Sequence, residues 1–264
     1  MIDIHCHIIP GVDDGAKDLE ESLEMAKIAQ SEGIKTIINT SHYNMEFDYI
    51  MGEKLLIELD KFNNILKKKK INVDVKIGNE LYYSEDFLET IESKEFYTLN
   101  NSRYVLIEFS PTRFPKQLME IVYELKIRGY IPILAHVERY REVQDDPRII
   151  EDAVKEGALV QINASTVLGK GSKGAVRVSE LLLNSNLVHF IATDAHGSNR
   201  RRPVIRKAYD YISRKYGECM ADRLFVKNPE CVINNEDILL ERESDKKVES
   251  KIKKSFLAKL FSKK

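Results

Sequence analysis

The chain has 264 residues, of which 43% are hydrophobic and 31% charged, and its formal net charge is −1. This length fits one large α/β domain or two small ones, and the composition is that of a soluble globular protein. The near-neutral charge provides no general attraction to nucleic acid or to a membrane, so no nucleic-acid partner is expected. No apolar run approaches the roughly 18 residues that cross a bilayer. The three cysteines form no CxxC pair and the start, MIDIHCHIIPG, lacks the features of a signal peptide, which together predict a cytoplasmic protein.

Seven β-strands are expected, because short apolar, β-branched runs alternate with amphipathic stretches. The runs cover residues 2–8, 34–40, 73–79, 103–109, 131–136, 158–163 and 187–193. Several of them, such as YVLIEF and VHFIAT, are almost entirely apolar, which is typical of strands that are buried on both faces. Amphipathic helices are expected between the strands, most clearly over residues 18–31, 116–128 and 147–156.

This alternation predicts a parallel sheet with right-handed crossovers. An open, doubly wound sheet fits the alternation as well as a closed one. Histidines and carboxylates follow six of the seven strands, and only a barrel gathers so many strand ends around one point. We therefore predict an α/β fold, a distorted seven-stranded (β/α) barrel with outer helices, over residues 1–235.

Residues 236–264 are expected to form a separate charged tail. Its first part, 236–245, holds five acidic residues against one arginine, whereas residues 246–264 hold eight lysines against one glutamate. Five apolar residues would share one face of a helix here: Ile252, Phe256, Leu257, Leu260 and Phe261. The tail is either a frayed, solvated end or a peripheral contact with an anionic membrane or an acidic partner.

The candidate metal ligands are the polar residues at the strand ends. They are His5, His7, Asp14, His42, Glu80, Glu108, His136, Asp194 and His196. His5 and His7 share one face of the first strand because side chains alternate with period two, which directs Cys6 to the other face, where an apolar role is expected. A carboxylate that ends an apolar strand, as in VLIEF, is costly to bury without a cation. Each residue alone also fits an ordinary structural role, but the set together indicates a metal centre.

Nine ligands that mix imidazole and carboxylate are too many for one ion, so two or three divalent ions are expected. Ligand type does not separate Mn²⁺, Fe²⁺ and Zn²⁺. Three such ions would bring six positive charges against four carboxylates, and this excess would attract a phosphoryl group and acidify a bound water. Arg139 lies close to His136, and the run Arg200, Arg201 and Arg202 follows His196, so guanidinium groups are available for phosphate oxygens.

Several strings resemble the polymerase-and-histidinol-phosphatase (PHP) superfamily, and within it the manganese-dependent protein-tyrosine phosphatases of bacterial capsule and exopolysaccharide synthesis. They are MIDIHCHIIPGVDDGAKDLEESLEMAKIA, IGNELYY, LIEFS, PILAHVERY, QINASTVLGKGSKGA and VHFIATDAHG. The resemblance covers about residues 1–235 and implies a PHP-like phosphatase domain that prefers manganese. It also implies a tyrosine-phosphorylated protein as the partner, the C-terminal tail of a bacterial tyrosine autokinase.

The same resemblance implies how the ligands are shared among three ions. The first ion would be held by His5, His7, Glu80 and Asp194; the second by Glu80, Glu108 and His136; and the third by Asp14, His42 and His196. Arg139 and Arg201 match the phosphate-contacting arginines, although the neighbouring Arg200 and Arg202 leave that choice open. We expect a metal-bridging hydroxide to attack phosphorus in line, without a covalent intermediate, because the chain has no Cys-x5-Arg motif.

Three other interpretations stay open at this point. The first is a PHP-type phosphoesterase that acts on a small molecule such as histidinol phosphate. The second is an amidohydrolase, which also begins with HxH but commonly uses a lysine on the fourth strand and eight strands. The third is a metal-stabilised regulator that binds a kinase without turnover. The oligomeric state is also left open, homo-oligomers included.

Overall fold

The computed structural model describes residues 1–112 and 114–238, and within them nine strands form two parallel sheets. One sheet has the order β1-β2-β4 and the other the order β3-β5-β6-β7-β8-β9. The strands are β1 (Ile2–Cys6), β2 (Thr36–Asn39), β3 (Ser41–Tyr43), β4 (Asp74–Lys76), β5 (Asn79–Tyr82), β6 (Tyr104–Glu108), β7 (Ile131–Leu134), β8 (Leu159–Asn163) and β9 (Phe190–Ala192). Every pair is parallel, so the predicted α/β class is confirmed.

The strand count differs from the prediction because two of the seven expected strands are interrupted. The second becomes β2 and β3, and the third becomes β4 and β5, with both paths continuing past their predicted ends. Since β2 pairs with β4 and β3 with β5, the interruption lies at the same level in both. Side-chain amides take over backbone hydrogen bonds there: Asn39 accepts from the Ile8 and Ile9 N–H groups, and Asn79 donates to the Ser41 carbonyl.

The ring of strands closes between the first and last strand paths. The Asp194 N–H donates to the His5 carbonyl and the His7 N–H to the Ala195 carbonyl, both at 2.8 Å. A bridge between Cys6 and Ala195 is also parallel. The C-terminal ends of all strand paths therefore face one mouth, as expected for a distorted barrel.

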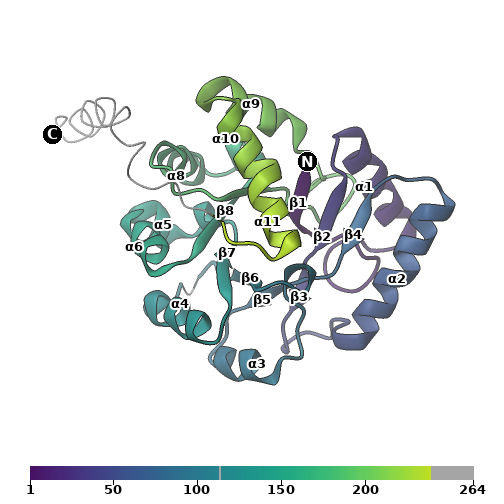
Figure 1. The fold of residues 1–264 in the computed structure, drawn as a ribbon, viewed down its shortest axis with the longest axis horizontal. Coiled ribbons are helices and arrows are strands. Elements are labelled where there is room, and N and C mark those ends of the chain that lie inside the picture. Colours follow the sequence, from purple (N-terminus) through teal and green to yellow (C-terminus); the bar gives the residue numbers. More distant parts are fainter. Residues whose placement is uncertain (113, 239–264) are drawn as a thin grey trace.

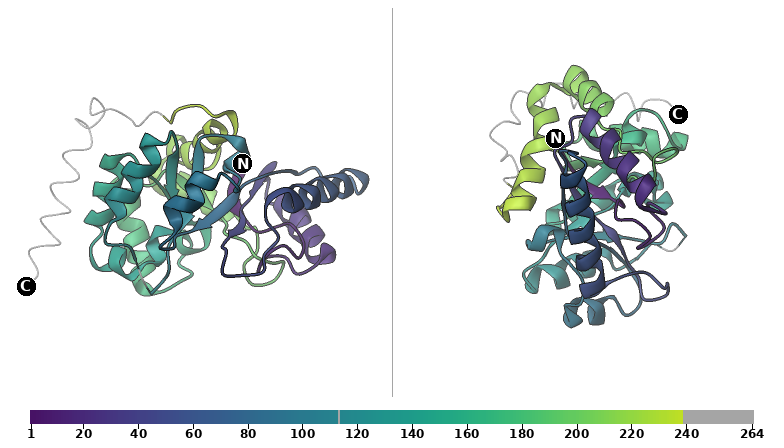
Figure 2. Two further views of the ribbon diagram at one scale, coloured as in Figure 1. Left: turned by 90° about the horizontal axis from the view of Figure 1, so that it is seen from below. Right: turned by 90° about the vertical axis from the view of Figure 1, so that its right-hand side faces the viewer.

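Helices surround the strands (Figure 1). They are α1 (Leu19–Ser31), α2 (Gly52–Lys68), α3 (Phe87–Ser93), α4 (Leu118–Ile127), α5 (Arg141–Asp145), α6 (Arg148–Glu156), α7 (Ala164–Val167), α8 (Lys173–Asn184), α9 (Arg206–Tyr216), α10 (Glu218–Asp222) and α11 (Asn228–Asn234), with the short 3-10 helices η1 (Leu99–Asn101) and η2 (Val137–Arg139) and the π-helix η3 (Arg223–Lys227). The three clearest sequence predictions correspond to α1, α4 and α6. Figure 2 shows α1 and α2 together at one end of the molecule. None of these helices combines the length and apolar character needed to traverse a bilayer, within the part of the chain described.

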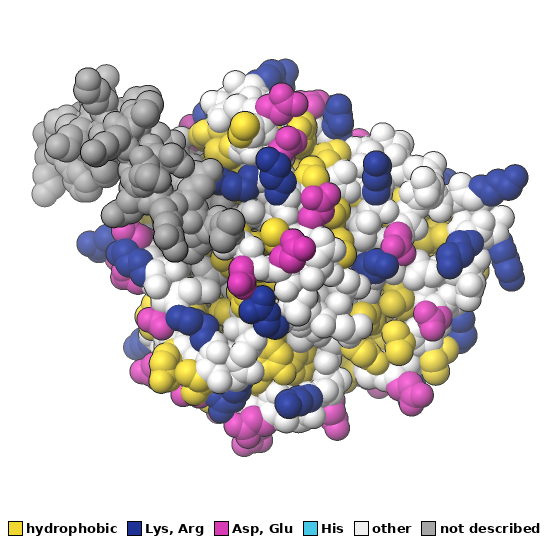
Figure 3. Space-filling view, in the orientation of Figure 1, with side chains coloured by type: hydrophobic (Ala, Val, Ile, Leu, Met, Phe, Trp, Pro, Cys, Tyr) yellow, Lys and Arg dark blue, Asp and Glu magenta, His cyan; other side chains and the backbone are white. Residues whose placement is uncertain are grey.

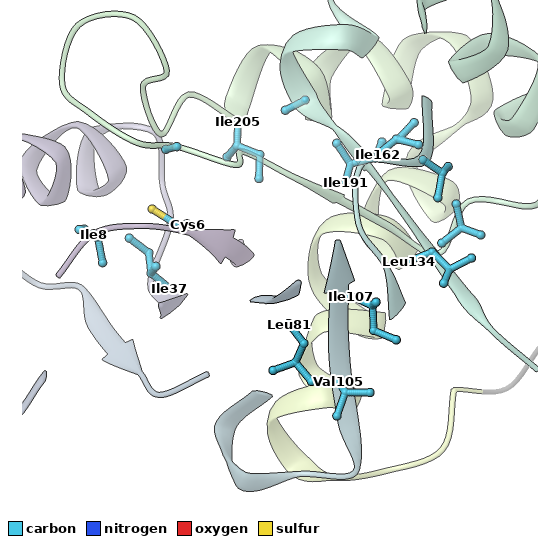
Figure 4. Packing of buried hydrophobic residues seen from close by; sticks show 14 of the residues in the cluster. Cys6, Ile8, Ile37, Leu81, Val105, Ile107, Leu134, Ile162, Ile191 and Ile205 are labelled. Carbon is cyan, nitrogen blue, oxygen red and sulfur yellow. The ribbon is translucent and has the colours of Figure 1, made fainter. Parts of the chain in front are cut away.

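Two apolar clusters lie on opposite sides of the strands. The larger one fills the space between strands and helices and includes Cys6 and Ile37 (Figure 4). The smaller one fills the barrel interior, with rows of alternate residues such as Tyr104 and Leu106. The same alternation continues to Glu108, so the interior is apolar at its base and polar at its mouth. The barrel is therefore a packed core that carries its polar groups at one end.

The first strand changes register, which decides which of its residues face the interior. Ile2 and Ile4 belong to the inner cluster, whereas Cys6 belongs to the outer one. The pairing with β2 shifts between Asp3 and Cys6, a bulge that exchanges the two faces of the strand. After this bulge His5, rather than an even-numbered residue, faces the barrel mouth.

Helix α11 covers the base of the barrel, opposite the mouth. Its Val232 belongs to the inner cluster, and α11 crosses the front of Figure 1. In the same orientation, the part of the surface that Figure 3 colours exposes mixed charges and no histidine. The chain beyond α11 stays on the barrel through residue 238: the Tyr104 hydroxyl donates to the Glu236 carbonyl, and Arg103 pairs with Asp237 at 2.9 Å. The basic amphipathic segment predicted over 246–264 lies outside the described residues.

Candidate metal centre

All nine candidate ligands converge at the C-terminal mouth of the barrel. Imidazole nitrogens and carboxylate oxygens approach each other at 3.2 to 3.6 Å throughout the group. Most of the side chains are buried, and Asp14 is the exception, with its side chain 54% exposed. We call this set the cage: His5, His7, Asp14, His42, Glu80, Glu108, His136, Asp194 and His196.

Glu80 lies at the centre of the cage. Its Oε2 is 3.2 Å from His5 Nε2 and 3.3 Å from both His7 Nε2 and His42 Nδ1, and its Oε1 is 3.2 Å from His136 Nε2. The pairing of β3 with β5 places Glu80 directly opposite His42. A single carboxylate therefore faces four imidazoles, the position that a bridging ligand needs.

The other contacts largely follow the three predicted groups. Asp194 Oδ1 lies 3.4 Å from His5, Glu108 Oε1 lies 3.4 Å from His136, and Asp14 Oδ1 lies 3.4 Å from His42. The geometry also departs from that grouping. His7 gathers with Asp14, His42 and His196 as well as with His5 and Glu80, and His42 gathers with Glu80 and Glu108.

Two cage residues have backbones that few side chains adopt. His136 has φ 32° and ψ 51°, and Asp194 has φ 51°, both in the left-handed region. Each lies two residues after the last residue of a strand, and this turn of the backbone directs the side chain across the mouth. Such conformations are costly for residues other than glycine and concentrate at functional sites.

The turn GVDDG folds close beneath the cage. Gly11 has φ 66°, and a Cβ on Gly15 would lie 2.4 Å from the His7 carbonyl oxygen, so only glycine fits there. Asp13 in this turn was not predicted, yet its side chain is fully buried. Its Oδ2 accepts from His7 Nδ1 at 2.6 Å and from the His42 N–H at 3.0 Å. Asp13 therefore holds both His7 and His42 in place. Its position in the GVDDG turn, beside the predicted ligand Asp14, is the feature of the sequence that points to it.

The sixth strand path also contributes, although no ligand was expected there. Gln161 on β8 accepts from His5 Nδ1 at 3.1 Å and from the His136 N–H at 2.8 Å, and it donates to Asn163. Asn163 in turn donates to Asp194 at 2.9 Å. Both side chains are buried and hold cage members without facing the centre, as partners of metal ligands commonly do.

The pKa values reflect the crowding of acids and imidazoles. Burial opposes the charged form of His136, but hydrogen bonds to Glu108 and Glu80 raise its pKa to about 10. Burial and the neighbouring His7 instead lower the pKa of His196 to about 3. Burial also opposes the charged form of Glu80, yet His5 and the other histidines hold its pKa well below the usual range. Protons and cations therefore compete for the same positions in this cage.

Two arginines approach the cage from outside. Arg139 Nη1 lies 3.1 Å from Asp194 Oδ2, and Arg201 Nη2 lies 2.5 Å from Asp194 Oδ1. Each arginine side chain remains more than 40% exposed. Arg200 and Arg202 are exposed and form no ion pair with the described residues, so Arg201 is the member of the run that turns inward.

The residues fit a set of divalent cations by their own chemistry. Five imidazoles and four carboxylates without thiolate suit first-row divalent ions. His136 turns its Nε2 toward the cage, 3.2 Å from Glu80 Oε1 and 3.4 Å from Glu108 Oε1. The groups His7–Asp14–His42–His196, His5–His7–Glu80 and His42–Glu80–Glu108 each bring their donor atoms within 4.8 Å of one another.

Comparison with known proteins identifies the family. Residues 1–234 match the family model described as capsular polysaccharide synthesis, CpsB/CapC. The chain belongs to this family. The predicted resemblance to a family of bacterial capsule synthesis is thereby confirmed.

Relatives of this CpsB/CapC chain are named as phosphatases. The tyrosine-protein phosphatase YwqE of Bacillus subtilis is 34% identical over 238 residues, which cover 90% of this chain and 93% of the relative. A solved structure described as that of unique metal-dependent tyrosine phosphatases, YwqE from Bacillus subtilis and CpsB from Streptococcus pneumoniae, is similar with a TM-score of 0.86 and 33% identity; the match covers 92% of this chain and 100% of the other. Histidinol phosphate phosphatase from Lactococcus lactis, at 16% identity and a TM-score of 0.54 over 81% of this chain and 92% of its own, shares the fold alone.

Proposed function

We propose that this chain is a metal-dependent protein-tyrosine phosphatase that serves capsule or exopolysaccharide synthesis. The observation that carries the proposal is the cage, in which four carboxylates and five imidazoles meet beside two inward-turned arginines. Membership of the CpsB/CapC family and the tyrosine-phosphatase names of relatives at about a third identity support the same activity.

The cage residues would hold two or three divalent ions, manganese by preference, with iron or zinc as the alternatives. Bound there, the ions would lower the pKa of a water so that it serves as the nucleophile, and they would offset charge on the phosphoryl oxygens. The chain's own contribution is position. Glu80 faces four histidines, Asp13 fixes His7 and His42, and Gln161 fixes His5.

Arg139 and Arg201 would bind the phosphoryl oxygens. Both contact the buried Asp194 while their side chains remain more than 40% exposed, so they lie between the cage and the solvent from which a substrate arrives. Guanidinium groups bind phosphate through paired hydrogen bonds and keep their charge at any physiological pH. A tyrosine leaving group, with a pKa near 10, needs less protonation than an alkoxide, so the site needs no dedicated general acid.

The substrate we propose is a phosphotyrosine in the C-terminal tail of a bacterial tyrosine kinase. The mouth of the barrel carries the cage at its rim, with Asp14 and both arginines exposed, and such a rim suits a flexible segment more than a fully enclosed metabolite. We place the protein in the cytoplasm, where the three unpaired cysteines would remain reduced.

Turnover of a phosphotyrosyl peptide, measured beside turnover of histidinol phosphate, tests this function. We expect manganese-dependent release of phosphate from the peptide, with kcat/KM well above that for histidinol phosphate. His136→Ala and Asp194→Ala should abolish it, because each removes a donor that faces the centre of the cage. A preference for histidinol phosphate, or full activity in either variant, would contradict the proposal.

A further inference from the structure

The loop that follows His196 carries Arg201 and closes on itself beside the cage. The Arg201 carbonyl accepts hydrogen bonds from the His196 and Gly197 N–H groups, at 2.9 and 3.2 Å. The Arg201 side chain is 43% exposed, and among the described residues its only ion pair is with Asp194. An exposed side chain with a single partner takes its direction from the backbone that carries it. The position of Arg201 therefore depends on what holds residues 197–205, which we call the arginine loop.

Two carboxylates of α1 and its C-terminal cap hold the arginine loop, one near each end. Glu21 Oε1 accepts from the Ser198 N–H at 3.2 Å and from the Ser198 hydroxyl at 3.4 Å. Glu32 Oε2 accepts from the Ile205 N–H at 3.1 Å and from the Arg206 N–H at 2.8 Å. The two acids are eleven residues apart, which is about three helical turns, so they share one face of the helix. Helix α1 therefore supports the arginine loop along its length.

The Glu21 carboxylate makes contacts on both of its sides. Its other oxygen, Oε2, accepts from the Lys17 N–H at 3.3 Å, just after the turn that supplies Asp14. The N–H groups of Ser198 and Lys17 lower the pKa of Glu21, which keeps this carboxylate charged. A Cβ on Gly197 would lie 2.9 Å from Glu21 Oε1, so the carboxylate lies directly against this glycine. Glu21 therefore joins the turn that carries Asp14 to the arginine loop.

A helix-capping role explains only one side of this arrangement. Asp18 is the N-cap of α1 and accepts from the Glu21 N–H at 2.9 Å. A glutamate three residues after such a cap commonly reaches back to a backbone N–H at the start of the helix, and Glu21 does so at Lys17. Capping does not require the second oxygen, which accepts instead from the Ser198 N–H in the arginine loop. That contact needs a separate explanation.

We propose that Glu21 is a positioning residue that keeps Arg201 within reach of the phosphoryl oxygens. This inference rests on the proposed phosphatase function, in which Arg201 binds phosphate, and it adds a residue that itself binds neither phosphate nor metal. Glu21 fixes the backbone of Ser198, and the hydrogen bonds that close the loop carry this restraint to Arg201. The guanidinium is thereby kept beside Asp194. With a loosened loop, the arginine would turn into solvent and bind phosphate less tightly.

The test combines Glu21→Gln and Arg201→Ala in the manganese-loaded protein. Glutamine keeps the shape of the side chain but has one oxygen, so its amide nitrogen must face the N–H of either Ser198 or Lys17. Calorimetry with phenylphosphonate, which cannot be hydrolysed, measures how well the site binds a phosphoryl-like group. We expect Glu21→Gln to weaken this binding by roughly 3- to 10-fold, the range of one lost hydrogen bond, with Mn²⁺ affinity unchanged. Added to Arg201→Ala, the same substitution should have no further effect.

Glu24→Gln is the matched control for the loss of a charge from α1. Glu24 lies on the same helix and pairs with Lys27 at 3.2 Å. Its substitution removes one negative charge and one ion pair without touching the arginine loop. We expect wild-type affinity for phenylphosphonate in this variant.

Three results would overturn the inference. The first is unchanged phenylphosphonate affinity in Glu21→Gln. The second is an equal loss with and without Arg201, because Glu21 would then act on the site as a whole. The third is weaker Mn²⁺ binding in Glu21→Gln, which would assign Glu21 to the Asp14 turn. The proposed function fails separately: if the wild-type protein does not hydrolyse a phosphotyrosyl peptide while the variants behave as expected, Glu21 still positions Arg201 and only the assigned reaction is wrong.

Discussion

Asp13 offers a sharp test of how the cage is held together, because it orients ligands without being one of the predicted nine. Its Oδ2 accepts from His7 Nδ1 at 2.6 Å and from the His42 N–H at 3.0 Å, and its Oδ1 accepts from the Gly15 N–H at 3.0 Å. Asp13→Asn keeps the shape but has a single oxygen, so in either orientation its amide nitrogen faces a donor. Loss of a hydrogen bond to a charged group costs about 1.5–3 kcal/mol, a factor of roughly 10 to 100.

We therefore expect Asp13→Asn to weaken Mn²⁺ binding by about 10- to 100-fold, the range seen when partners of metal ligands are removed. Titration calorimetry gives the affinity, and phosphotyrosyl-peptide turnover against Mn²⁺ concentration should shift by the same factor. Asp48→Asn is the matched control: it removes the same charge from the neighbouring loop, and Asp48 forms no hydrogen bond or ion pair with the described residues. Wild-type Mn²⁺ affinity in Asp13→Asn would refute the reasoning.

Three further changes test other parts of the structure. Cys6→Ala should keep most turnover, because this buried thiol, whose pKa burial raises well above normal, lies in the outer apolar cluster; loss of activity in a folded variant would argue for a thiol nucleophile. Gly15→Ala should displace His7 and remove activity, since its Cβ would lie 2.4 Å from the His7 carbonyl oxygen, and a fully active variant would contradict the described turn. Burial lowers the pKa of His189 to about 4. Between pH 6.5 and 4 this histidine is therefore protonated in the unfolded chain but neutral in the folded protein. The free energy of unfolding should fall by about 3 kcal/mol as the pH drops through this range. His189→Asn should flatten that part of the pH profile in urea unfolding, and an unchanged profile would show that His189 does not cause it.

The strand ends were predictable because parallel strands must present their carboxyl ends at one edge. A histidine or carboxylate after VLI, PILA or FIAT therefore had to reach the same mouth, and Glu108, His136 and Asp194 do so. Alternation also predicted the outward direction of Cys6 correctly. Ile4 nevertheless faces inward, because a bulge in β1 shifts the register between Asp3 and Cys6. A periodic pattern in the sequence does not predict such a bulge.

The residues that the sequence did not reveal are those that act through others. Gln161 and Asn163 lie in the strand LVQIN, where two buried amides interrupt an apolar run, but amides are not the ligands expected in such a site. Asp13 was passed over for Asp14, because adjacent acids in a turn cannot be told apart without the turn's geometry. The stacking of Tyr49 on His42, and of Phe47 on Tyr49, could not be predicted either, because it depends on the path of a loop. The interruptions of two strands depend on hydrogen bonds of the Asn39 and Asn79 side-chain amides. The pattern of apolar residues therefore did not predict them.

The most direct test of the account joins metal analysis of the purified protein with phosphotyrosyl-peptide turnover before and after chelation. We predict two or three divalent ions per chain, loss of turnover when they are removed and recovery on addition of Mn²⁺. Undiminished turnover by a protein shown to be free of metal would contradict the claim that the nine gathered side chains work as a metal centre.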